Sequence, residues 1–176
     1  SPYRGRGSFE KIYGRTKDAF SYEWMELYDL EIDSKRDNEA VFRAQTGLAP
    51  EEFAGKRVLD AGCGMGRNLR FVAGWAGEIV GMDLGEGVEQ AARIMAGDPK
   101  VHLVQGNLMQ PPFKAETLDA AFSLGVLHHT PDARKSFMTL AALIRPGGAL
   151  AVWLYPKGPR LKDALNDGLR QFTMRL

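Results

Sequence analysis

The 176-residue sequence predicts an open α/β fold in which helices cover both faces of a parallel β-sheet. From residue 56 onward, short apolar runs alternate with amphipathic stretches in which apolar residues recur every three or four positions. Nearly continuous apolar strands are typical of parallel sheets that are buried on both faces, and helical crossovers supply the cover. The composition, 44% apolar and 26% charged, suffices for one compact domain with a core.

The N-terminal quarter is predicted to be helical after a short arm. Residues 1–17 carry five basic side chains, one acidic side chain and three glycines, which is typical of a flexible basic arm. Residues 18–55 form a separate helical segment. Within it, Phe20, Trp24 and Tyr28 recur at the spacing of one helical face.

A second helix is predicted in the same segment. Ser34 and Asp37 have the spacing of a capping box that opens a helix, which then runs to about Thr46. Gly47 suits the end of that helix. The remaining residues, 56–176, form the main α/β domain.

Five strands are expected in the main domain, with amphipathic helices between them. The predicted strands are Arg57–Ala61, Glu78–Asp83, Val101–Gln105, Leu118–Ser123 and Ala149–Tyr155. The apolar faces that predict helices lie in Leu69–Ala76, Val88–Met95 and Ala133–Ile144. Open sheets of this kind bind ligands outside the carboxyl ends of their strands, so residues that follow each strand are the candidates for a site.

A glycine loop joins the first predicted strand to the first helix of the main domain. Gly62, Gly64 and Gly66 lie in this loop. Residues without a side chain permit tight turns and a close approach of the backbone to a ligand. By itself, the loop leaves open a structural turn that binds nothing.

Two acidic residues narrow the choice of ligand. Asp83 ends the second predicted strand, where a carboxylate accepts both hydroxyls of a ribose. Asp60 precedes the glycine loop, where its charge would repel a pyrophosphate and favour a cation. S-adenosylmethionine carries an ammonium and a sulfonium and no phosphate, so it fits this loop better than NAD does. An NAD-dependent oxidoreductase is therefore disfavoured.

The segment Val58–Gly64 closely resembles the first motif of the class I S-adenosylmethionine-dependent methyltransferases, of the small-molecule type. The resemblance covers roughly residues 56–155. Two later segments are similar to further motifs of that family: Ser123–Asp132, beside the transferable methyl group, and Ile144–Gly148, the turn before the fifth strand. The resemblance implies a Rossmann-like fold preceded by N-terminal helices, with S-adenosylmethionine as the cofactor.

The resemblance also implies a role for each matching residue. The residues implied at the cofactor are Asp60, Gly62, Cys63, Gly64, Asp83, Leu84, Asn107, Leu108 and Ser123. Asp60 and the loop backbone would meet the methionine moiety, and Asp83 would hold the ribose hydroxyls. Leu84 would lie against the adenine. Asn107, where an aspartate is more usual, would reach the adenine amino group through its amide oxygen.

His128 and His129 are the candidate catalytic residues, because they follow the fourth strand and histidine titrates near neutral pH. A general base is needed only when the methyl acceptor arrives protonated. Neighbouring side chains in a turn are expected to point in different directions, so only one of the two would face the acceptor. Alternatively, the histidines cap the helix that begins near Asp132 or bind buried carbonyl groups.

The flanks of the matched region are also predicted. A complete fold of this family continues past the fifth strand with a helix and an antiparallel strand pair. Here residues 156–176 contain one helix-like pattern, Leu161–Phe172. The sequence therefore predicts that the strand pair is missing and that the chain is a fragment, since an uncovered apolar edge strand would aggregate. Residues 18–55 would form a helical lid or cap.

Composition excludes several other functions. The 23 basic and 22 acidic residues leave a net charge of +1, which does not indicate a nucleic-acid partner, and no apolar run has the length of a membrane helix. The single cysteine, Cys63, forms neither an internal disulfide nor a thiolate cluster, so no metal is expected. A cytoplasmic protein with a small-molecule methyl acceptor is predicted, and the oligomeric state stays open.

The predicted reaction is in-line transfer of a methyl group to an O, N or C nucleophile of a small metabolite. Two alternatives remain open. The first is a catalytically inactive subunit that binds S-adenosylmethionine. The second is a nucleic-acid methyltransferase, although the fourth strand is not followed by the Asn/Asp-Pro-Pro-aromatic segment of enzymes that methylate base amino groups.

Overall fold

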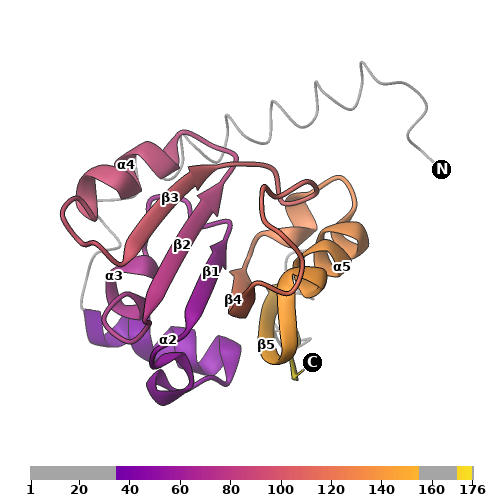
Figure 1. Cartoon of the computed structure of the whole chain (residues 1–176), viewed down its shortest axis with the longest axis horizontal. Coiled ribbons are helices and arrows are strands. Elements are labelled where there is room, and N and C mark those ends of the chain that lie inside the picture. Colours follow the sequence, from indigo (N-terminus) through magenta and orange to yellow (C-terminus); the bar gives the residue numbers. More distant parts are fainter. Residues whose placement is uncertain (1–34, 155–169, 176) are drawn as a thin grey trace, which may run out of the picture.

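The computed structural model describes residues 35–154 and 170–175. Its core is a six-stranded sheet with the order β3-β2-β1-β4-β5-β6 (Figure 1). The strands are β1 (Arg57–Ala61), β2 (Glu78–Asp83), β3 (Val101–Gln105), β4 (Leu118–Leu124), β5 (Ile144–Leu154) and β6 (Arg170–Arg175). Strands β1 to β5 are parallel, and β6 is antiparallel to β5.

Helices cover both faces of the sheet, as predicted. The helices are α2 (Lys35–Thr46), α3 (Leu69–Val72), α4 (Gly87–Ile94) and α5 (Ala133–Leu143), with 3-10 turns η1 (Pro50–Phe53) and η2 (Leu127–His129). One apolar cluster joins α2, α3 and α4 to one face of the sheet. A second cluster joins α5 and η2 to the other face. The class of fold, a Rossmann-like α/β sandwich, is confirmed.

Aromatic packing fixes α2 on the sheet. Phe42 is buried among four aromatic rings, and its ring centroid lies 5.0 Å from that of Phe122 and 5.3 Å from that of Phe71. In Figure 1, α2 lies near the end of the sheet opposite the arrowheads of β1 and β2. Helix α2 therefore packs on the sheet, and the role of residues 18–55 as a lid or cap stays a prediction. Residues 18–34, with the aromatic group predicted there, lie outside the described residues, as does the arm 1–17.

The predicted strand bounds hold for β1, β2 and β3 and differ for β5. The structure begins β5 at Ile144, five residues before the predicted start, so the turn Pro146–Gly148 lies inside the strand. The pairing of β4 with β5 shifts between Leu118 and Ala120, which absorbs that turn as an irregularity. Proline and glycine therefore interrupt the ladder without ending the strand.

The C-terminal prediction is corrected. The structure pairs β6 with β5 along six residues, from Ala149 with Arg175 to Leu154 with Arg170, so β5 is not an uncovered edge. Phe172, which the sequence pattern placed in a helix, pairs with Val152 in the ladder. Antiparallel pairing satisfies the backbone groups that β5 presents on the side away from β4. Among the residues that the structure describes, one antiparallel strand thus follows the parallel sheet.

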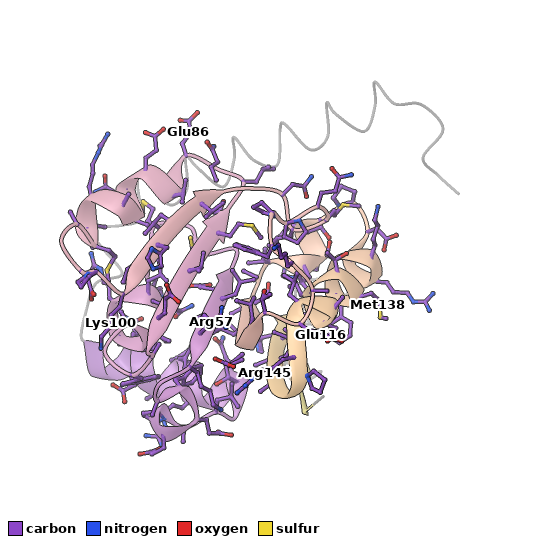
Figure 2. The ribbon with its side chains drawn as sticks, viewed as in Figure 1. Arg57, Glu86, Lys100, Glu116, Met138 and Arg145 are labelled. Atoms are coloured by element: carbon purple, nitrogen blue, oxygen red, sulfur yellow. The ribbon has the colours of Figure 1, made fainter. Side chains whose placement is uncertain are left out.

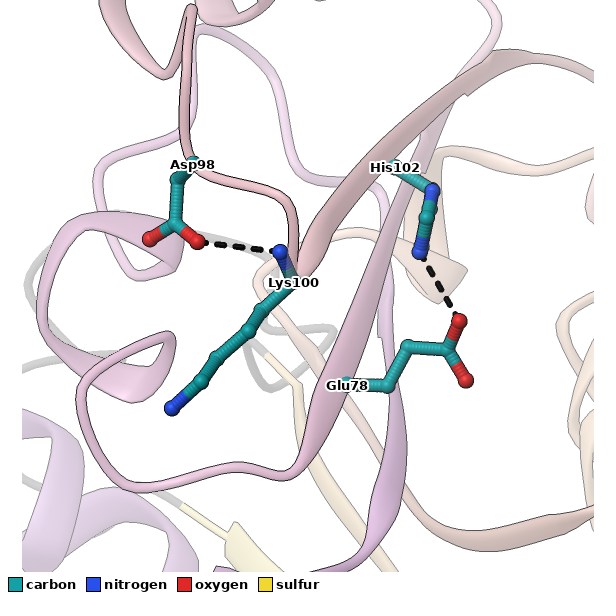
Figure 3. A network of polar contacts seen from close by, with 4 residues as sticks. All are labelled: Glu78, Asp98, Lys100 and His102. Atoms are coloured by element: carbon teal, nitrogen blue, oxygen red, sulfur yellow. Dashed lines mark hydrogen bonds and ion pairs between the residues drawn. The ribbon is translucent and has the colours of Figure 1, made fainter.

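Charged contacts mark the amino ends of the strands. Asp119 on β4 accepts a hydrogen bond from the backbone N of Arg57 at 2.6 Å, and its other oxygen lies 2.5 Å from Arg145 Nε. Figure 2 shows Arg57 and Arg145 near that end of the sheet. On the edge, His102 Nε2 lies 2.8 Å from Glu78 Oε1 (Figure 3). These contacts leave the opposite, carboxyl end for the candidate site.

Within residues 35–154 and 170–175, no helix has both the length and the apolar composition that crossing a bilayer requires.

Candidate functional site

The glycine loop after β1 is pinned to β2 and to the segment after β4. The backbone N atoms of Gly62 and Cys63 both donate to Met82 O, at 2.7 and 3.1 Å. Gly62 has a φ of +92°, and a Cβ at this position would overlap the methyl groups of Val126. The turn therefore requires glycine on two counts: its backbone conformation and the close contact with Val126.

The second glycine of the loop faces open space beside Asp83. Gly64 N donates to Asp83 Oδ2 at 2.9 Å. A Cβ built on Gly64 would meet no atom within 4 Å among the described residues. A ligand can therefore approach the backbone here, with Asp83 within one hydrogen bond of the loop, and the nucleoside-binding role of this loop stays a prediction.

Backbone hydrogen bonds fix the orientation of Asp83. Its Oδ1 accepts from Gly85 N at 2.7 Å, in addition to the bond from Gly64 N to Oδ2. Each carboxylate oxygen has a further lone pair with which to accept a ribose hydroxyl. Gln105 Nε2 donates to Leu84 O at 3.2 Å and so holds the segment after β2 against the end of β3.

Asp60 is buried, which the sequence did not predict. Its side chain is 2% exposed at the end of β1, and its Oδ2 accepts no hydrogen bond from the described residues. Burial, followed by the charge of Asp83, raises the pKa of Asp60 well above its ordinary value. A buried oxygen without a donor is unfavourable, and an ammonium that entered beside Asp60 would supply both a donor and a charge. The residues present thus fit the predicted cationic cofactor.

Replacing Asp60 with asparagine is expected to stabilise the cofactor-free protein at neutral pH by about 1 kcal/mol. The raised pKa of Asp60 means that the folded chain holds this proton more tightly than the unfolded chain, which ionises from about pH 3.8 upward, so stability falls as pH rises above that value. The gain in Asp60→Asn should therefore shrink toward pH 4. Urea unfolding at several pH values measures it; a variant less stable than wild type at pH 7 would mean that Asp60 has a favourable partner.

The other predicted cofactor residues lie around this loop, with different degrees of exposure. Gly106 N donates to Asp83 O at 2.8 Å, which brings the segment with Asn107 beside Asp83. Asn107 Oδ1 already accepts from Met109 N at 2.9 Å, so one of its lone pairs is used locally. Leu108 is buried.

Cys63 and Ser123 have structural contacts. Burial raises the pKa of the Cys63 thiol far above its ordinary value, which leaves it a packing side chain rather than a nucleophile. Ser123 is fully buried, and its hydroxyl donates to Ala61 O at 2.7 Å. This bond ties β4 to the base of the glycine loop, so the Ser123 hydroxyl has no exposed surface to offer a ligand. Its predicted contact with the cofactor stays a prediction.

The histidine turn lies next to the glycine loop. Gly125 N donates to Trp153 O at 2.9 Å, Val126 packs on Gly62, and η2 follows directly. The rings of His128 and His129 have centroids 3.9 Å apart, so the expectation that the two side chains diverge is wrong. The 3-10 turn brings the two neighbouring rings into contact, with their planes tilted by 49°.

Helix α5 is capped by a residue other than these histidines. Asp132 Oδ1 accepts from Lys135 N at 2.8 Å, which is the usual N-cap bond. The alternative that His128 or His129 caps this helix is therefore wrong. The two rings lie in the turn that Val126 joins to the glycine loop.

Burial sets the protonation of the histidine pair. It lowers the pKa of His128 to about 4, with a smaller contribution from His129, and it lowers the pKa of His129 as well. Both rings are therefore neutral at pH 7 and able to accept a proton. A low pKa makes His128 a weak base, which suits an acceptor that needs little help to lose its proton.

An NMR titration of the full chain should find His128 half-protonated near pH 4, more than two pH units below an ordinary histidine at 6.5. The reason is that charging the ring would leave it partly desolvated beside a second imidazole. The ring proton shifts of the His128→Gln variant assign the signal. A His128 titration near pH 6.5 would contradict the packing described here.

Sequence reasoning missed one residue of the loop region, Val126. Its contact with Gly62 joins the segments after β1 and β4, which are neighbours in the sheet but lie about sixty residues apart in the chain. No local sequence pattern predicts such a contact between distant segments. Within the described residues, no group of three or more His, Cys, Asp or Glu side chains could hold a metal ion.

Comparison with known proteins points to one family. Residues 59–152 match the sequence profile of the family described as a methyltransferase domain. The chain is 30% identical over 181 residues to a sterol 24-C-methyltransferase of Gibberella zeae, covering 94% of this chain and 45% of that protein. It is 31% identical over 132 residues to a tRNA U34 carboxymethyltransferase of Methylococcus capsulatus, covering 72% and 40%.

A solved structure is similar over the same region. The S-adenosylmethionine-dependent methyltransferase of Mesorhizobium loti is 27% identical and superposes with a TM-score of 0.57, covering 66% of this chain and 52% of that one. The chain spans about half the length of the curated relatives it matches.

Proposed function

Because the chain belongs to the methyltransferase domain family, we propose that it transfers a methyl group from S-adenosylmethionine to an O, N or C nucleophile of a small metabolite. S-adenosylmethionine is the cofactor of this family, in agreement with the sequence prediction. The observation that carries the proposal is the buried Asp60 Oδ2, which accepts no hydrogen bond from the described residues and lies near a second carboxylate. The paired acidic groups favour a cation and disfavour a diphosphate.

Three features of the loop would hold the cofactor. Asp60 offers an acceptor to the methionine ammonium, and Asp83, already oriented by Gly64 N and Gly85 N, offers its remaining lone pairs to the ribose. The open backbone at Gly64 leaves room for close approach. When bound, the cofactor supplies a methyl group on a sulfonium. The leaving group is a neutral thioether, which needs no acid. The chain lowers the barrier chiefly by positioning and by excluding water.

The histidine pair would act on the acceptor side. His128 and His129 lie after β4, and Val126 packs this segment on Gly62 of the loop. Neutral imidazoles can take a proton from an acceptor that arrives protonated, but the low pKa of His128 limits this to weakly basic or readily ionised nucleophiles. For an acceptor with a free lone pair or a reactive double bond, positioning alone would suffice.

Two observations support a small metabolite as the acceptor. The net charge of +1 provides no excess of basic side chains for a polyanion. The relative that covers 94% of this chain acts, by its name, on a sterol. A tRNA acceptor is the second candidate, favoured by the relative named for tRNA U34. A cytoplasmic location stays a prediction.

Calorimetry and a transfer assay test the proposal together. We expect S-adenosylmethionine and S-adenosylhomocysteine to bind the full chain and NAD to give no heat. A screen with methyl-tritiated S-adenosylmethionine over phenols, amines, carboxylic acids, sterols and bulk tRNA then identifies the acceptor. Label in tRNA alone would replace the small-metabolite proposal with the second candidate. Binding without transfer to any acceptor would indicate an inactive binding subunit, and binding of NAD alone would overturn the proposal.

A further inference from the structure

Two hydroxyl groups hold the turn that carries the histidine pair. Thr130 Oγ1 donates to Leu127 O at 2.6 Å, and Ser136 Oγ lies 3.0 Å from Thr130 Oγ1. Leu127 begins η2 and is buried. The two hydroxyls thus connect helix α5 to the first residue of the histidine turn.

The donor and the acceptor in each of these two hydrogen bonds follow from the chemistry of the groups. Leu127 O can only accept, so the single hydroxyl proton of Thr130 is used for that bond. Ser136 must then donate its own proton to Thr130 Oγ1. Ser136 is fully buried on α5, where a hydroxyl that lost its partner would be unfavourable. The position of the turn is therefore linked to the position of the helix.

The other side of the turn is held as firmly. Gly125 N donates to Trp153 O at 2.9 Å, and His129 N donates to Val126 O at 2.9 Å. Thr130 N adds a bond of 3.1 Å to the same Leu127 O that its hydroxyl contacts. The last two bonds are the 3-10 turn's own bonds, which have poor geometry in short turns, so the bond of Gly125 N and the link from Ser136 to Thr130 add support from outside the turn.

We propose that Ser136 and Thr130 are positioning residues that fix the adjacent His128 and His129 rings against the methyl acceptor. The inference rests on the proposed function, because the acceptor lies beside this turn only if the loop holds the cofactor. Neither residue contacts the glycine loop in the hydrogen bonds described for this chain. Their loss should therefore disturb the acceptor step and spare cofactor binding.

The test uses two disruptive variants, one conservative variant and one matched control. Ser136→Ala and Thr130→Val remove one link each, whereas Thr130→Ser keeps the hydroxyl. Thr117→Val is the control, because Thr117 Oγ1 also donates to a backbone carbonyl, that of Lys114 at 2.8 Å, in the turn before β4. Two readouts are measured on the full chain: the NMR ring signals of His128 and His129 without ligands, and the steady-state kinetics with the acceptor found by the screen.

Ser136→Ala is the informative variant, since the hydrogen bond described for its hydroxyl reaches the turn through Thr130. We expect it and Thr130→Val to shift both ring signals and to lower kcat/KM for the acceptor by roughly tenfold or more. The dissociation constant for S-adenosylmethionine should stay within about twofold of wild type. Thr130→Ser should restore ring signals and rate, and Thr117→Val should change neither.

The outcomes separate this inference from the proposed function. Unchanged ring signals in Ser136→Ala, or an equal loss in Thr117→Val, would overturn the positioning role even if methyl transfer is observed. Shifted ring signals with Thr130→Ser rescue would support the role even if no acceptor is methylated, in which case the proposed function fails by itself. A loss of cofactor affinity equal to the loss of rate would also overturn the inference, because it would mean a general disturbance of the site.

Discussion

Asp83→Ala is expected to weaken binding of S-adenosylmethionine by roughly tenfold or more, measured by calorimetry. Its carboxylate is the only acidic side chain that the described residues hydrogen-bond to the glycine loop, through Gly64 N at 2.9 Å. The substitution removes both the acceptor for the ribose and the bond that orients the loop. Either loss alone removes a charge-assisted hydrogen bond.

Asp98→Ala is the matched control for this variant. Asp98 also accepts a backbone hydrogen bond, from Lys100 N at 3.0 Å, but in the turn that leads into β3 at the amino end of the strand (Figure 3). Asp98→Ala should leave the dissociation constant for S-adenosylmethionine unchanged within error. If Asp83→Ala titrates like wild type, Asp83 does not belong to the pocket, and the assignment of the cofactor site to this loop fails.

Gly62→Ala is expected to destabilise the protein by roughly 2–4 kcal/mol. The added methyl group would overlap the Val126 side chain, and a φ of +92° is unfavourable for any residue with a Cβ. The melting temperature should fall by several degrees, since about 1 kcal/mol corresponds to roughly 2–4 °C in a domain of this size. Differential scanning calorimetry without ligand measures the change.

Two further variants separate the two causes. Gly97 has a φ of +91°, and a Cβ there would meet nothing within 4 Å, so Gly97→Ala reports the backbone cost alone, about 1–2 kcal/mol. In a double-mutant cycle, Val126→Ala should recover part of the loss in Gly62→Ala. Equal losses in Gly62→Ala and Gly97→Ala would show that the contact with Val126 carries no energy.

The parts of the fold that local patterns determine were predicted well from sequence. The bounds of β1, β2 and β3 agree with the structure because each is a short apolar run enclosed by turn residues. The glycine loop and Asp83 could be proposed as one site for a similar reason. The loop follows β1 and Asp83 ends β2, and the carboxyl ends of neighbouring parallel strands meet at one edge of the sheet.

The rest depends on contacts between distant segments. The burial of Asp60 and the contact of Val126 with Gly62 arise only when β1, β2 and β4 assemble. The ring contact between His128 and His129 follows from a 3-10 turn too short to leave a periodic signal. The pairing of β6 with β5 was missed because an apolar stretch with helical spacing can also form a strand when an edge needs a partner.

The environment of Asp60 bears on how the protein is best purified and stored. An acidic buffer would favour the protonated form of this carboxyl, because burial raises its pKa. A buffer near pH 4 would also begin to charge His128, because burial lowers the pKa of that ring to about 4. A mildly acidic buffer that stays well above pH 4 suits both groups, because it favours the protonated carboxyl and leaves His128 neutral. A tightly bound nucleoside with an ammonium group would neutralise the carboxyl at neutral pH, so the ligand is the better additive for long-term handling.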